Sequence, residues 1–596
     1  MSFPPPYGQQ PLPERDPRQG DGQQPQPQPP QYGYGTSGGY GYGQQQPGTP
    51  YGQNPYGQNP YGQSQDNPWG PPPPRRRRPS RRLIIGLAGA LAFVLVAVVG
   101  VVSFGLVGSG NDTATAKALE ARYTQAIDWQ HCSGQYYCGA IEAPLDWSST
   151  SSKSIRIALI EHRPKTGEAK QSIVVNPGGP GGSGVNFVGS SVLNAVDKTI
   201  ASKYNVVGFD PRGVGYSSAV KCYDAANTDT YLYGILPGAI GSKTWLAAQT
   251  KAQKKYGEAC KTNTGDLLAH VDTTSSARDM DLIRADLGAS KLNYIGYSYG
   301  SYLGTIYAGL YPGKVGRFVF DGADDPWYGD ASGISDDQTV QQAVGFEDDL
   351  KSWMKACLAG SAKAVGSGSC PFTATSVTAG MDDVQAMLAK VQKSPLDNSD
   401  GRKLGSATLA TAIFSAMYDT SEWPALTKAF AGVQAGDPKA AFALADAYND
   451  RTSSGKYYDN TSDAFLAITC LDDGGDSLSD QKKEFDALKK KAPVLGVYES
   501  YGAITCNEWP EKAVAAPAPV TAKGSGPILI LGNTGDPATP YAGAKALAKQ
   551  LDNGHLLTYV GEGHTIYGQG VSCIDTRVDS YLETGKTPAA GIRCTK

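Results

Sequence analysis

Helix-like and strand-like segments alternate between residues 275 and 324. Segment 275–288 has a Ser cap, apolar residues at helical spacing and a closing Gly, and the apolar run 291–298 follows it. A second helical pattern, 299–312, precedes the apolar run 316–324. Parallel strands need long crossover connections, which are usually helices, so this alternation is typical of a parallel sheet covered by helices. The sequence therefore predicts an α/β fold with a mostly parallel central sheet.

Ser298 lies at the junction of a predicted strand and a predicted helix, in the pattern Gly296-Tyr297-Ser298-Tyr299-Gly300. A serine nucleophile is often held on such a sharp turn, where small neighbours let the backbone bend and expose the hydroxyl. The alternative is an ordinary turn serine, because a chain with 73 glycines matches this pattern easily by chance. The strand-turn-helix context favours the nucleophile.

A serine nucleophile needs a histidine base. The chain has 5 histidines, and of these only His555 and His564 follow Ser298. His555 opens a strand-like run, whereas His564 follows that run in a Gly-flanked loop, where functional groups are usually found. We therefore predict that His564 is the base and that His555 is a surface or packing residue.

The base needs an acid that fixes its tautomer. Asp536 follows an apolar run that directly precedes the histidine strand, and Asp321 follows the earlier run 316–320. Both positions are credible, and the order of the strands favours Asp536. Thr539 is expected to order the same loop or to cap the next helix.

An acyl-transfer site also needs backbone N–H groups directed at the developing oxyanion. Tyr299, the residue after the predicted nucleophile, supplies one of them. The strand 172–175 leads into a Gly-rich loop, from which Gly178 or Gly179 supplies another. A phosphate-binding loop is the alternative, but the Lys-Ser/Thr ending of that motif is absent.

The 10 cysteines all follow residue 131, beyond an apolar run at 83–107 that is considered next. An even number of cysteines on the exported side of a chain is typical of a disulfide framework. We expect sequential pairing of Cys132, Cys138, Cys222, Cys260, Cys357, Cys370, Cys470, Cys506, Cys573 and Cys594. Neither a Cys-x-x-Cys pair nor clustered His supports a metal site, so no metal or other cofactor is predicted. The net charge of -3 argues against nucleic acid as a partner.

The first hundred residues differ from the rest of the chain. Residues 1–82 are rich in Pro, Gln, Gly and Tyr and end in an arginine cluster, and we predict a disordered tail that binds unknown partners or simply stays solvated. The uncharged, mostly apolar run 83–107 is long enough to span a bilayer, and the arginines before it place the tail in the cytoplasm. An uncleaved membrane anchor is favoured over a cleaved signal peptide, although 114–116 offers a small-x-small site.

Several ordered motifs resemble the prolyl and tripeptidyl aminopeptidases of the α/β-hydrolase superfamily. They are Asn176-Pro177-Gly178-Gly179-Pro180-Gly181, "VVGFDPRGVGYS" at 206–217 and the Ser298 turn. "CGAIEAPLDW" at 138–147, "GNTGDPATP" and "GEGHT" look specifically like the exported actinobacterial tripeptidyl aminopeptidases. The resemblance implies an α/β-hydrolase fold in which Asp536 and His564 are the acid and the base. The predicted long tail and uncleaved span depart from the secreted members, so we expect the chain to stay at the membrane rather than to be released into the medium.

Strand patterns stop between residues 327 and 506, where Ala-rich helical segments predict a cap inserted into the fold. The expected organisation is a stalk at 108–128, a core in two parts at 129–326 and 507–596, and the cap between them. In the resembled family, exopeptidase behaviour depends on the cap, and cap carboxylates would hold a free α-ammonium group. Candidates are Glu347, Asp348, Asp349, Asp472 and Asp473, of which the pair next to Cys470 is favoured, although exposed surface positions are the simpler interpretation.

The predicted function is a membrane-anchored extracellular serine aminopeptidase that removes short peptides, of three residues by the resemblance, from free N-termini. An esterase or lipase with the same triad is the alternative, because the triad fixes acyl transfer and not the acyl group. A non-catalytic envelope scaffold is a third hypothesis, which the intact Ser, Asp and His oppose.

Overall fold

The computed structural model describes residues 122–149, 153–325, 327, 338–514 and 519–596. The predicted tail and the predicted membrane span at 83–107 lie outside these residues, as does most of the predicted stalk. No helix within the described residues is long and apolar enough to cross a bilayer.

A single ten-stranded sheet runs through the core in the order β1-β2-β3-β5-β4-β6-β7-β10-β11-β12. Its strands are parallel from β5 to β12, and β1, β2 and β3 form an antiparallel edge. The central strands are continuous apolar runs buried on both faces, as parallel sheets require. The strands are β1 Gln130–Ser133, β2 Tyr136–Pro144, β3 Ser154–His162, β4 Ser172–Asn176, β5 Asn205–Phe209, β6 Leu292–Tyr297, β7 Val315–Asp321, β10 Ile528–Gly535, β11 Gly554–Glu562 and β12 Arg593–Cys594.

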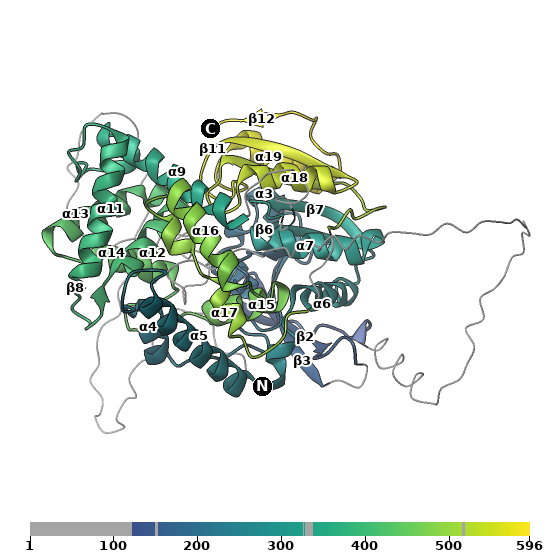
Figure 1. Ribbon diagram of the computed structural model, residues 1–596. Helices are drawn as coiled ribbons and strands as arrows, with labels where there is room; N and C mark the ends of the chain where they lie inside the picture. Colours follow the sequence, from purple (N-terminus) through teal and green to yellow (C-terminus); the bar gives the residue numbers. More distant parts are fainter. Residues whose placement is uncertain (1–121, 150–152, 326, 328–337, 515–518) are drawn as a thin grey trace, which may run out of the picture.

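Helices cover both faces of this sheet (Figure 1). On one face, α6 (Thr273–Asp286), α7 (Tyr299–Leu310) and α18 (Tyr541–Gln550) contribute to one apolar cluster. On the other face, α2 (Gly184–Ser190) and α19 (Ser572–Thr584) contribute to a second cluster. Along the strands from β2 to β7 and along β10 and β11, neighbouring residues enter opposite clusters, so these strands link the two layers. The mostly parallel sheet and its helices confirm the predicted α/β-hydrolase fold.

A helical cap lies between β7 and β10 in the sequence and beside the sheet in space (Figure 1). Its helices build an apolar cluster of their own, in which Ala residues allow close helix packing. The described elements between the two strands are α9 Gln338–Leu358, α10 Ala362–Val365, α11 Val377–Lys393, β8 Leu396–Asp397, β9 Lys403–Leu404, α12 Ser406–Met417, the short 3₁₀ helix η4 Thr420–Glu422, α13 Trp423–Ala435, α14 Lys439–Tyr448, α15 Thr461–Asp472, α16 Leu478–Lys491, the short 3₁₀ helix η5 Gly496–Glu499, and α17 Ala503–Asn507.

The packing of the cap does not follow the order of the sequence. Leu232 and Tyr233 of α4 (Ala225–Tyr233) and Trp245 of α5 (Lys243–Thr264) precede Ser298, yet they belong to the apolar cluster of the cap. Conversely, α15 lies between the cap helices in sequence, but its apolar residues pack in the core cluster with α6 and α7. The cap and the core therefore interlock.

Disulfide bonds join all ten cysteines in the sequential pairing that we expected. One of them, Cys470–Cys506, ties α15 to α17, and Cys222–Cys260 ties the segment before α4 to α5. The other pairs are Cys132–Cys138, Cys357–Cys370 and Cys573–Cys594. Such crosslinks favour an oxidising compartment for the folded domain.

Candidate active site

Ser298 occupies a strained turn between β6 and α7. Its φ of 53° and ψ of -127° lie outside the regions that non-glycine residues ordinarily adopt. Gly296 and Gly300 make the turn possible, because a Cβ atom on Gly296 would lie 2.3 Å from the carbonyl oxygen of Gly300. The Ser298 N–H donates to the Asp321 carbonyl at the end of β7, at 2.9 Å. The turn therefore holds the serine at the carboxyl edge of the sheet, the usual position of ligands in such folds.

His564 and Asp536 form a buried hydrogen-bonded pair at the same edge. Nδ1 of His564 lies 2.9 and 3.0 Å from the two carboxylate oxygens of Asp536. The N–H groups of Ala538 and Thr539 donate to Oδ1 of Asp536, at 3.0 and 2.9 Å, and the Thr539 hydroxyl lies 3.1 Å from Oδ2. These donors fix the orientation of the carboxylate. A proton on Nδ1 then leaves Nε2 as the basic nitrogen.

The end of β7 brings the serine and the histidine together. Asp321 accepts from the Ser298 N–H through its carbonyl, and a Cβ atom on the next residue, Gly322, would lie 2.8 Å from Cε1 of His564. In the sheet, β7 and β10 lie between β6, which ends at the nucleophile turn, and β11, which ends just before the histidine loop. Residues 321 and 322, at the end of β7, therefore lie between the serine and the histidine. The three residues Ser298, Asp536 and His564 thus come from three different loops at one edge.

The Asp321 side chain has another role in this arrangement. Its carboxylate accepts from the N–H groups of Ile566, at 2.9 and 3.1 Å, and Tyr567, at 2.8 Å, just after His564. Burial raises the pKa of Asp321 to about 6. This carboxyl group orients the histidine loop through its backbone, whereas Asp536 holds the imidazole directly.

His555 lies away from this arrangement, in the first half of β11. Its Nε2 is 3.1 Å from Oδ1 of Asn553, and the side chain is half-buried. The structure therefore brings His564, and not His555, to the serine edge.

The Gly-rich loop after β4 lies against the nucleophile turn. A Cβ atom on Gly178 would lie 3.0 Å from Cβ of Ser298 and 3.2 Å from the backbone nitrogen of Tyr299. The Gly178 N–H itself donates to Oδ1 of Asn176, at 2.9 Å. The Gly178 N–H is therefore already used within the loop. Of the residues predicted to stabilise an oxyanion, Tyr299 and Gly179 are the better candidate donors.

Asp472, a predicted amine ligand, is buried against the core. Its carboxylate accepts from the N–H and the hydroxyl of Thr273, at 2.9 and 2.5 Å, and the Thr273 hydroxyl lies 2.5 Å from that of Tyr299. Burial raises the pKa of Asp472 to about 7. Asp473 follows at the end of α15 and is half-buried. Asp472 is thus close to the nucleophile turn, but Thr273 occupies its oxygens.

The other predicted carboxylates lie on α9 and differ from one another. Glu347 is buried and accepts from the N–H groups of Val494 and Leu495, so it supports the backbone after α16. Asp348 is exposed and pairs with Lys351 at 2.9 Å. Asp349 is buried, and burial raises its pKa well above the ordinary value. Among the described residues, Glu347 and Asp348 have partners of their own, whereas neither carboxylate oxygen of Asp349 has a hydrogen-bond partner.

Sequence reasoning did not identify Tyr418, which lies at the end of α12 and contacts the histidine. Its carbonyl accepts from the His564 N–H at 2.9 Å, and its ring packs edge-on against the imidazole with centroids 5.5 Å apart. A tyrosine at the end of an Ala-rich helix carries no motif, so only the folded cap reveals it.

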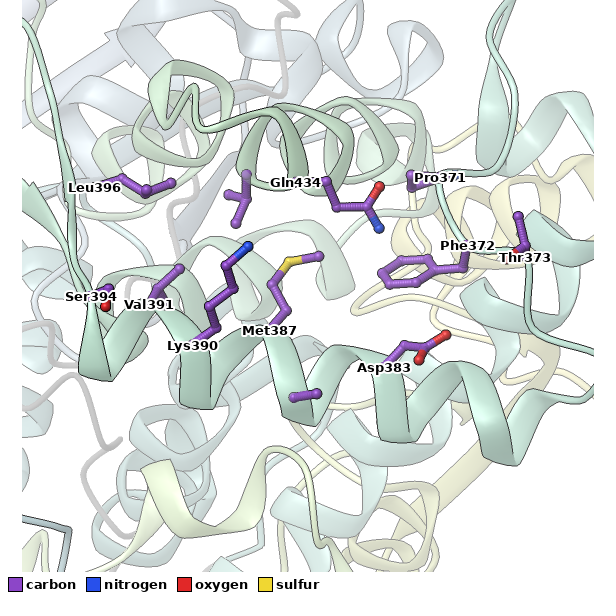
Figure 2. Close-up of a pocket in the computed structure, with 12 residues that line it drawn as sticks. Pro371, Phe372, Thr373, Asp383, Met387, Lys390, Val391, Ser394, Leu396 and Gln434 are labelled. Carbon is purple, nitrogen blue, oxygen red and sulfur yellow. The ribbon is translucent and has the colours of Figure 1, made fainter.

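Figure 2 shows a different hollow, inside the cap and lined by residues of α11 and α13 and the loops around them. It has a volume of about 310 Å³, and Phe372, Met387 and Val391 are among its apolar lining residues. Neither Ser298 nor His564 lines it, so it is separate from the site described above.

The chain is similar to known hydrolases along most of its length. Residues 171–356 match the family model described as alpha/beta hydrolase fold, and residues 492–594 match the one described as TAP-like protein. "Serine protease Hip1" of Mycobacterium tuberculosis is 33% identical over 538 residues, which is 86% of this chain and 98% of that protein. "Tripeptidyl aminopeptidase" of Streptomyces lividans is 33% identical over 81% of this chain and 89% of its own length. "Carboxylesterase B" of M. tuberculosis is 32% identical over 77% and 86%, respectively.

Proposed function

Because the chain belongs to the α/β-hydrolase family of serine peptidases that includes Hip1 and the tripeptidyl aminopeptidases, we propose that it is an aminopeptidase. In this proposal it releases short peptides, of three residues, from free N-termini through an acyl-enzyme on Ser298. The observation that carries the proposal is the His564–Asp536 hydrogen-bonded pair at the sheet edge that also presents Ser298.

The chemistry follows from the positions of these groups. Oγ of Ser298 attacks the scissile carbonyl carbon while its proton passes to Nε2 of His564. The N–H groups of Tyr299 and Gly179 stabilise the resulting oxyanion. The C–N bond then breaks, the imidazolium returns its proton to the leaving amine, and an acyl-enzyme remains. Water, activated by the same imidazole, attacks the ester and releases the peptide acid, while Asp536 stabilises the imidazolium at both stages.

Replacing Ser298 by Ala tests this mechanism. Cleavage of an Ala-Pro-Ala chromogenic peptide should fall by about six orders of magnitude, because no other group forms the acyl-enzyme. Folding should persist, since only a hydroxyl is removed. A fluorophosphonate probe should label the wild-type protein and fail on the variant. Labelling of the variant at another serine, or cleavage near the wild-type rate, would falsify the assignment.

An esterase is the second candidate, because "Carboxylesterase B" covers most of the chain at 32% identity. The two functions differ in the group that the enzyme releases and in the need for a free amine. Wild-type kcat/KM for the free peptide, for its N-acetyl form and for a p-nitrophenyl ester separates them. A peptidase prefers the free peptide over the acetylated one, whereas an esterase hydrolyses the ester and neither peptide.

We further propose that the domain is exported and held at the membrane by residues 83–107. The arginines before this run, its uncharged length and the five disulfides after it support this orientation. Protease added to intact cells should cut the catalytic domain and leave the tail protected. Cleavage of the tail alone contradicts the orientation, and catalytic domain in the medium contradicts the anchor.

A further inference from the structure

Thr273, the first residue of α6, lies between the nucleophile turn and the inserted segment. Its hydroxyl donates to Oδ2 of Asp472 at 2.5 Å, and its N–H donates to Oδ1 at 2.9 Å. The hydroxyl of Tyr299, the residue after the nucleophile, lies 2.5 Å from that of Thr273. Because Thr273 gives its one hydroxyl proton to Asp472, Tyr299 is the donor to Thr273. A buried chain of hydrogen bonds therefore runs from Tyr299 through Thr273 to Asp472.

The Tyr299 N–H, a candidate oxyanion donor, belongs to the peptide unit that joins Ser298 to Tyr299. The orientation of this unit depends on the strained conformation of Ser298, with a φ of 53° and a ψ of -127°. Such strain persists only where the surrounding structure holds the backbone firmly. The hydroxyl and the N–H of Ser301 donate to the carbonyl of the unit, at 2.6 and 2.8 Å. The Tyr299 side chain holds the other end, through its hydroxyl and through its ring, which packs edge-on against Tyr302 at 5.8 Å.

Asp472 brings the inserted segment into this chain. It ends α15, which packs with the core, and the Cys470–Cys506 disulfide fixes the helix two residues earlier. A carboxylate beside the first N–H groups of α6 also suits the partial positive charge at a helix N-terminus. Capping α6 in this way requires only the bond to the Thr273 N–H. The second bond, to the Thr273 hydroxyl, continues to Tyr299 and has no part in the cap.

We propose that Thr273, Asp472 and the hydroxyl of Tyr299 position the oxyanion donor of the enzyme. This inference rests on the proposed function, with Ser298 as the nucleophile. The three groups act through the backbone of Tyr299 rather than on the substrate, and are therefore positioning residues. An oxyanion donor is effective only when its nitrogen lies about 2.7–3.1 Å from the developing charge, so a less firmly held Tyr299 stabilises the transition state less. Through α15, the inserted segment thus contributes to the chemical step.

Tyr299→Phe is the first test, because it removes one end of the chain and leaves both bonds between Thr273 and Asp472. For Ala-Pro-Ala-p-nitroanilide, kcat should fall about 10-fold with little change in KM, since the lost stabilisation is confined to the transition state. Complete removal of an oxyanion donor costs more, about 10²–10³-fold. Tyr307→Phe is the matched control. Tyr307 is also buried on α7, and its hydroxyl donates to Asp281 of α6 at 3.0 Å, so this variant loses a bond between the same two helices and should keep the wild-type kcat.

Two substitutions of Thr273 test the middle of the chain. Thr273→Ser keeps the hydroxyl and should keep most of the wild-type kcat. Thr273→Val keeps the shape but leaves Tyr299 and Asp472 without this partner, and it should lower kcat about 10²-fold. The double variant with Tyr299→Phe should be no slower than Thr273→Val, because both substitutions break the same chain. The urea midpoint of each variant shows that the measured enzyme is folded.

A peptide aldehyde, Ala-Pro-alaninal, provides a readout that a merely structural role would not change. Oγ of Ser298 adds to the aldehyde carbon, the hydroxyl proton passes to His564, and the former carbonyl oxygen takes the position of the oxyanion. The inhibition constant should rise by the factor by which Tyr299→Phe lowers kcat. On the Ser298→Ala background, the affinity for the uncleaved Ala-Pro-Ala-p-nitroanilide should be the same with and without Tyr299→Phe.

The outcomes separate this inference from the proposed function. A wild-type kcat in both Tyr299→Phe and Thr273→Val overturns the positioning role, and so does an equal loss in Tyr307→Phe, because any bond between the two helices would then have the same effect. A wild-type enzyme that leaves the peptide intact contradicts the aminopeptidase function instead. In that case p-nitrophenyl acetate replaces the peptide, because hydrolysis of the ester needs the same oxyanion donors, and the order of the variants tests the positioning role as before.

Discussion

At the scale of single residues, several residues in or beside the candidate active site have a positive φ, a backbone conformation that residues with a Cβ atom rarely adopt. Ser298 has a φ of 53°, Thr565, next to His564, has a φ of 61°, and Gly322 has a φ of 61°. Each left-handed position is costly for a residue with a Cβ atom, and such strain gathers at functional sites. At Ser298 and Thr565 the fold tolerates the cost, whereas at Gly322 the space beside His564 also excludes a side chain.

Gly322→Ala should therefore impair catalysis more than folding. The new Cβ atom would lie 2.8 Å from Cε1 and 3.2 Å from Nδ1 of His564, so the imidazole must shift. A displacement of this kind can lower kcat/KM about 10²-fold. The left-handed backbone adds about 1 kcal/mol of destabilisation. Gly288→Ala is the matched control, because Gly288 has a φ of 68° and no atom within 4 Å of the added Cβ. Equal activity of the two variants contradicts the crowding at His564.

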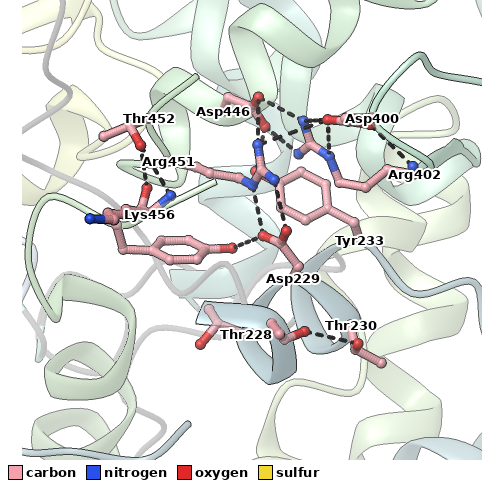
Figure 3. A network of polar contacts seen from close by, with 12 residues as sticks. Thr228, Asp229, Thr230, Tyr233, Asp400, Arg402, Asp446, Arg451, Thr452 and Lys456 are labelled. Atoms are coloured by element: carbon pink, nitrogen blue, oxygen red, sulfur yellow. Dashed lines mark hydrogen bonds and ion pairs between the residues drawn. The ribbon is translucent and has the colours of Figure 1, made fainter. Parts of the chain in front are cut away.

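At the scale of elements, an ion network fastens the cap to α4 (Figure 3). Nε and Nη2 of Arg451 donate to the two carboxylate oxygens of Asp229 on α4, at 2.7 Å each. Arg402, after β8, pairs with Asp446 of α14 and lies over the Tyr233 ring at 4.3 Å. Side-chain exposure is only 7% at Arg451 and 10% at Arg402, so water screens these pairs weakly. The network joins an element before Ser298 to two elements of the insertion.

Arg451→Met should destabilise the protein by about 2 kcal/mol, because Asp229 loses a bidentate partner in a site that admits little water. The urea midpoint at about pH 7 measures the change. Lys153→Met is the control, since the Lys153–Asp266 pair is exposed, with 79% and 72% of the two side chains accessible, and such pairs contribute little. Equal midpoints for both variants would mean that the buried network contributes no more than a surface pair.

The sequence predicted the elements of the sheet edge better than those of the cap. Ser298, Asp536 and His564 each follow an apolar run closely, and parallel strands present their carboxyl ends at one edge, so strand order alone brings the three together. Helical periodicity in the cap indicates which face is buried but not which element covers it. For that reason neither the contact of Tyr418 with His564 nor the packing of α4 on the cap was predicted.

At the scale of the whole molecule, the folded protein buries several acids whose pKa values are raised. Burial raises the pKa values of Asp210, Asp321, Asp324 and Asp463 to about 6, those of Asp286 and Asp472 to about 7, and that of Glu499 to about 8. In the unfolded chain these groups ionise at about pH 4. The folded state therefore binds more protons than the unfolded state from about pH 4 to about pH 8, and stability should fall as the pH rises through this window.

Groups with lowered pKa values, such as His162 and Asp400, act in the other direction but do not reverse this balance. Burial lowers the pKa of His162, so its contribution to stability rises with pH around its ordinary value. Asp400 is partly buried, but hydrogen bonds from Arg402 and Asn398 lower its pKa to about 2, and its contribution is lost only below about pH 4. The balance over the neutral range is thus set by the acids with raised pKa values.

The melting temperature at constant ionic strength should therefore be highest at about pH 4 and decrease steadily toward about pH 8.5, the reverse of the common behaviour in which paired carboxylates gain stability from ionisation. Scanning calorimetry with the disulfides intact measures it. Glu499→Gln should flatten the decrease from about pH 4.5 to about pH 8, where the folded protein keeps the Glu499 proton and the unfolded chain has lost it, and should leave the slope above about pH 8.5 unchanged. A melting temperature that rises from pH 5 to 8 in the wild type would show that these carboxyl groups ionise inside the fold without cost, against the proton balance argued from their burial.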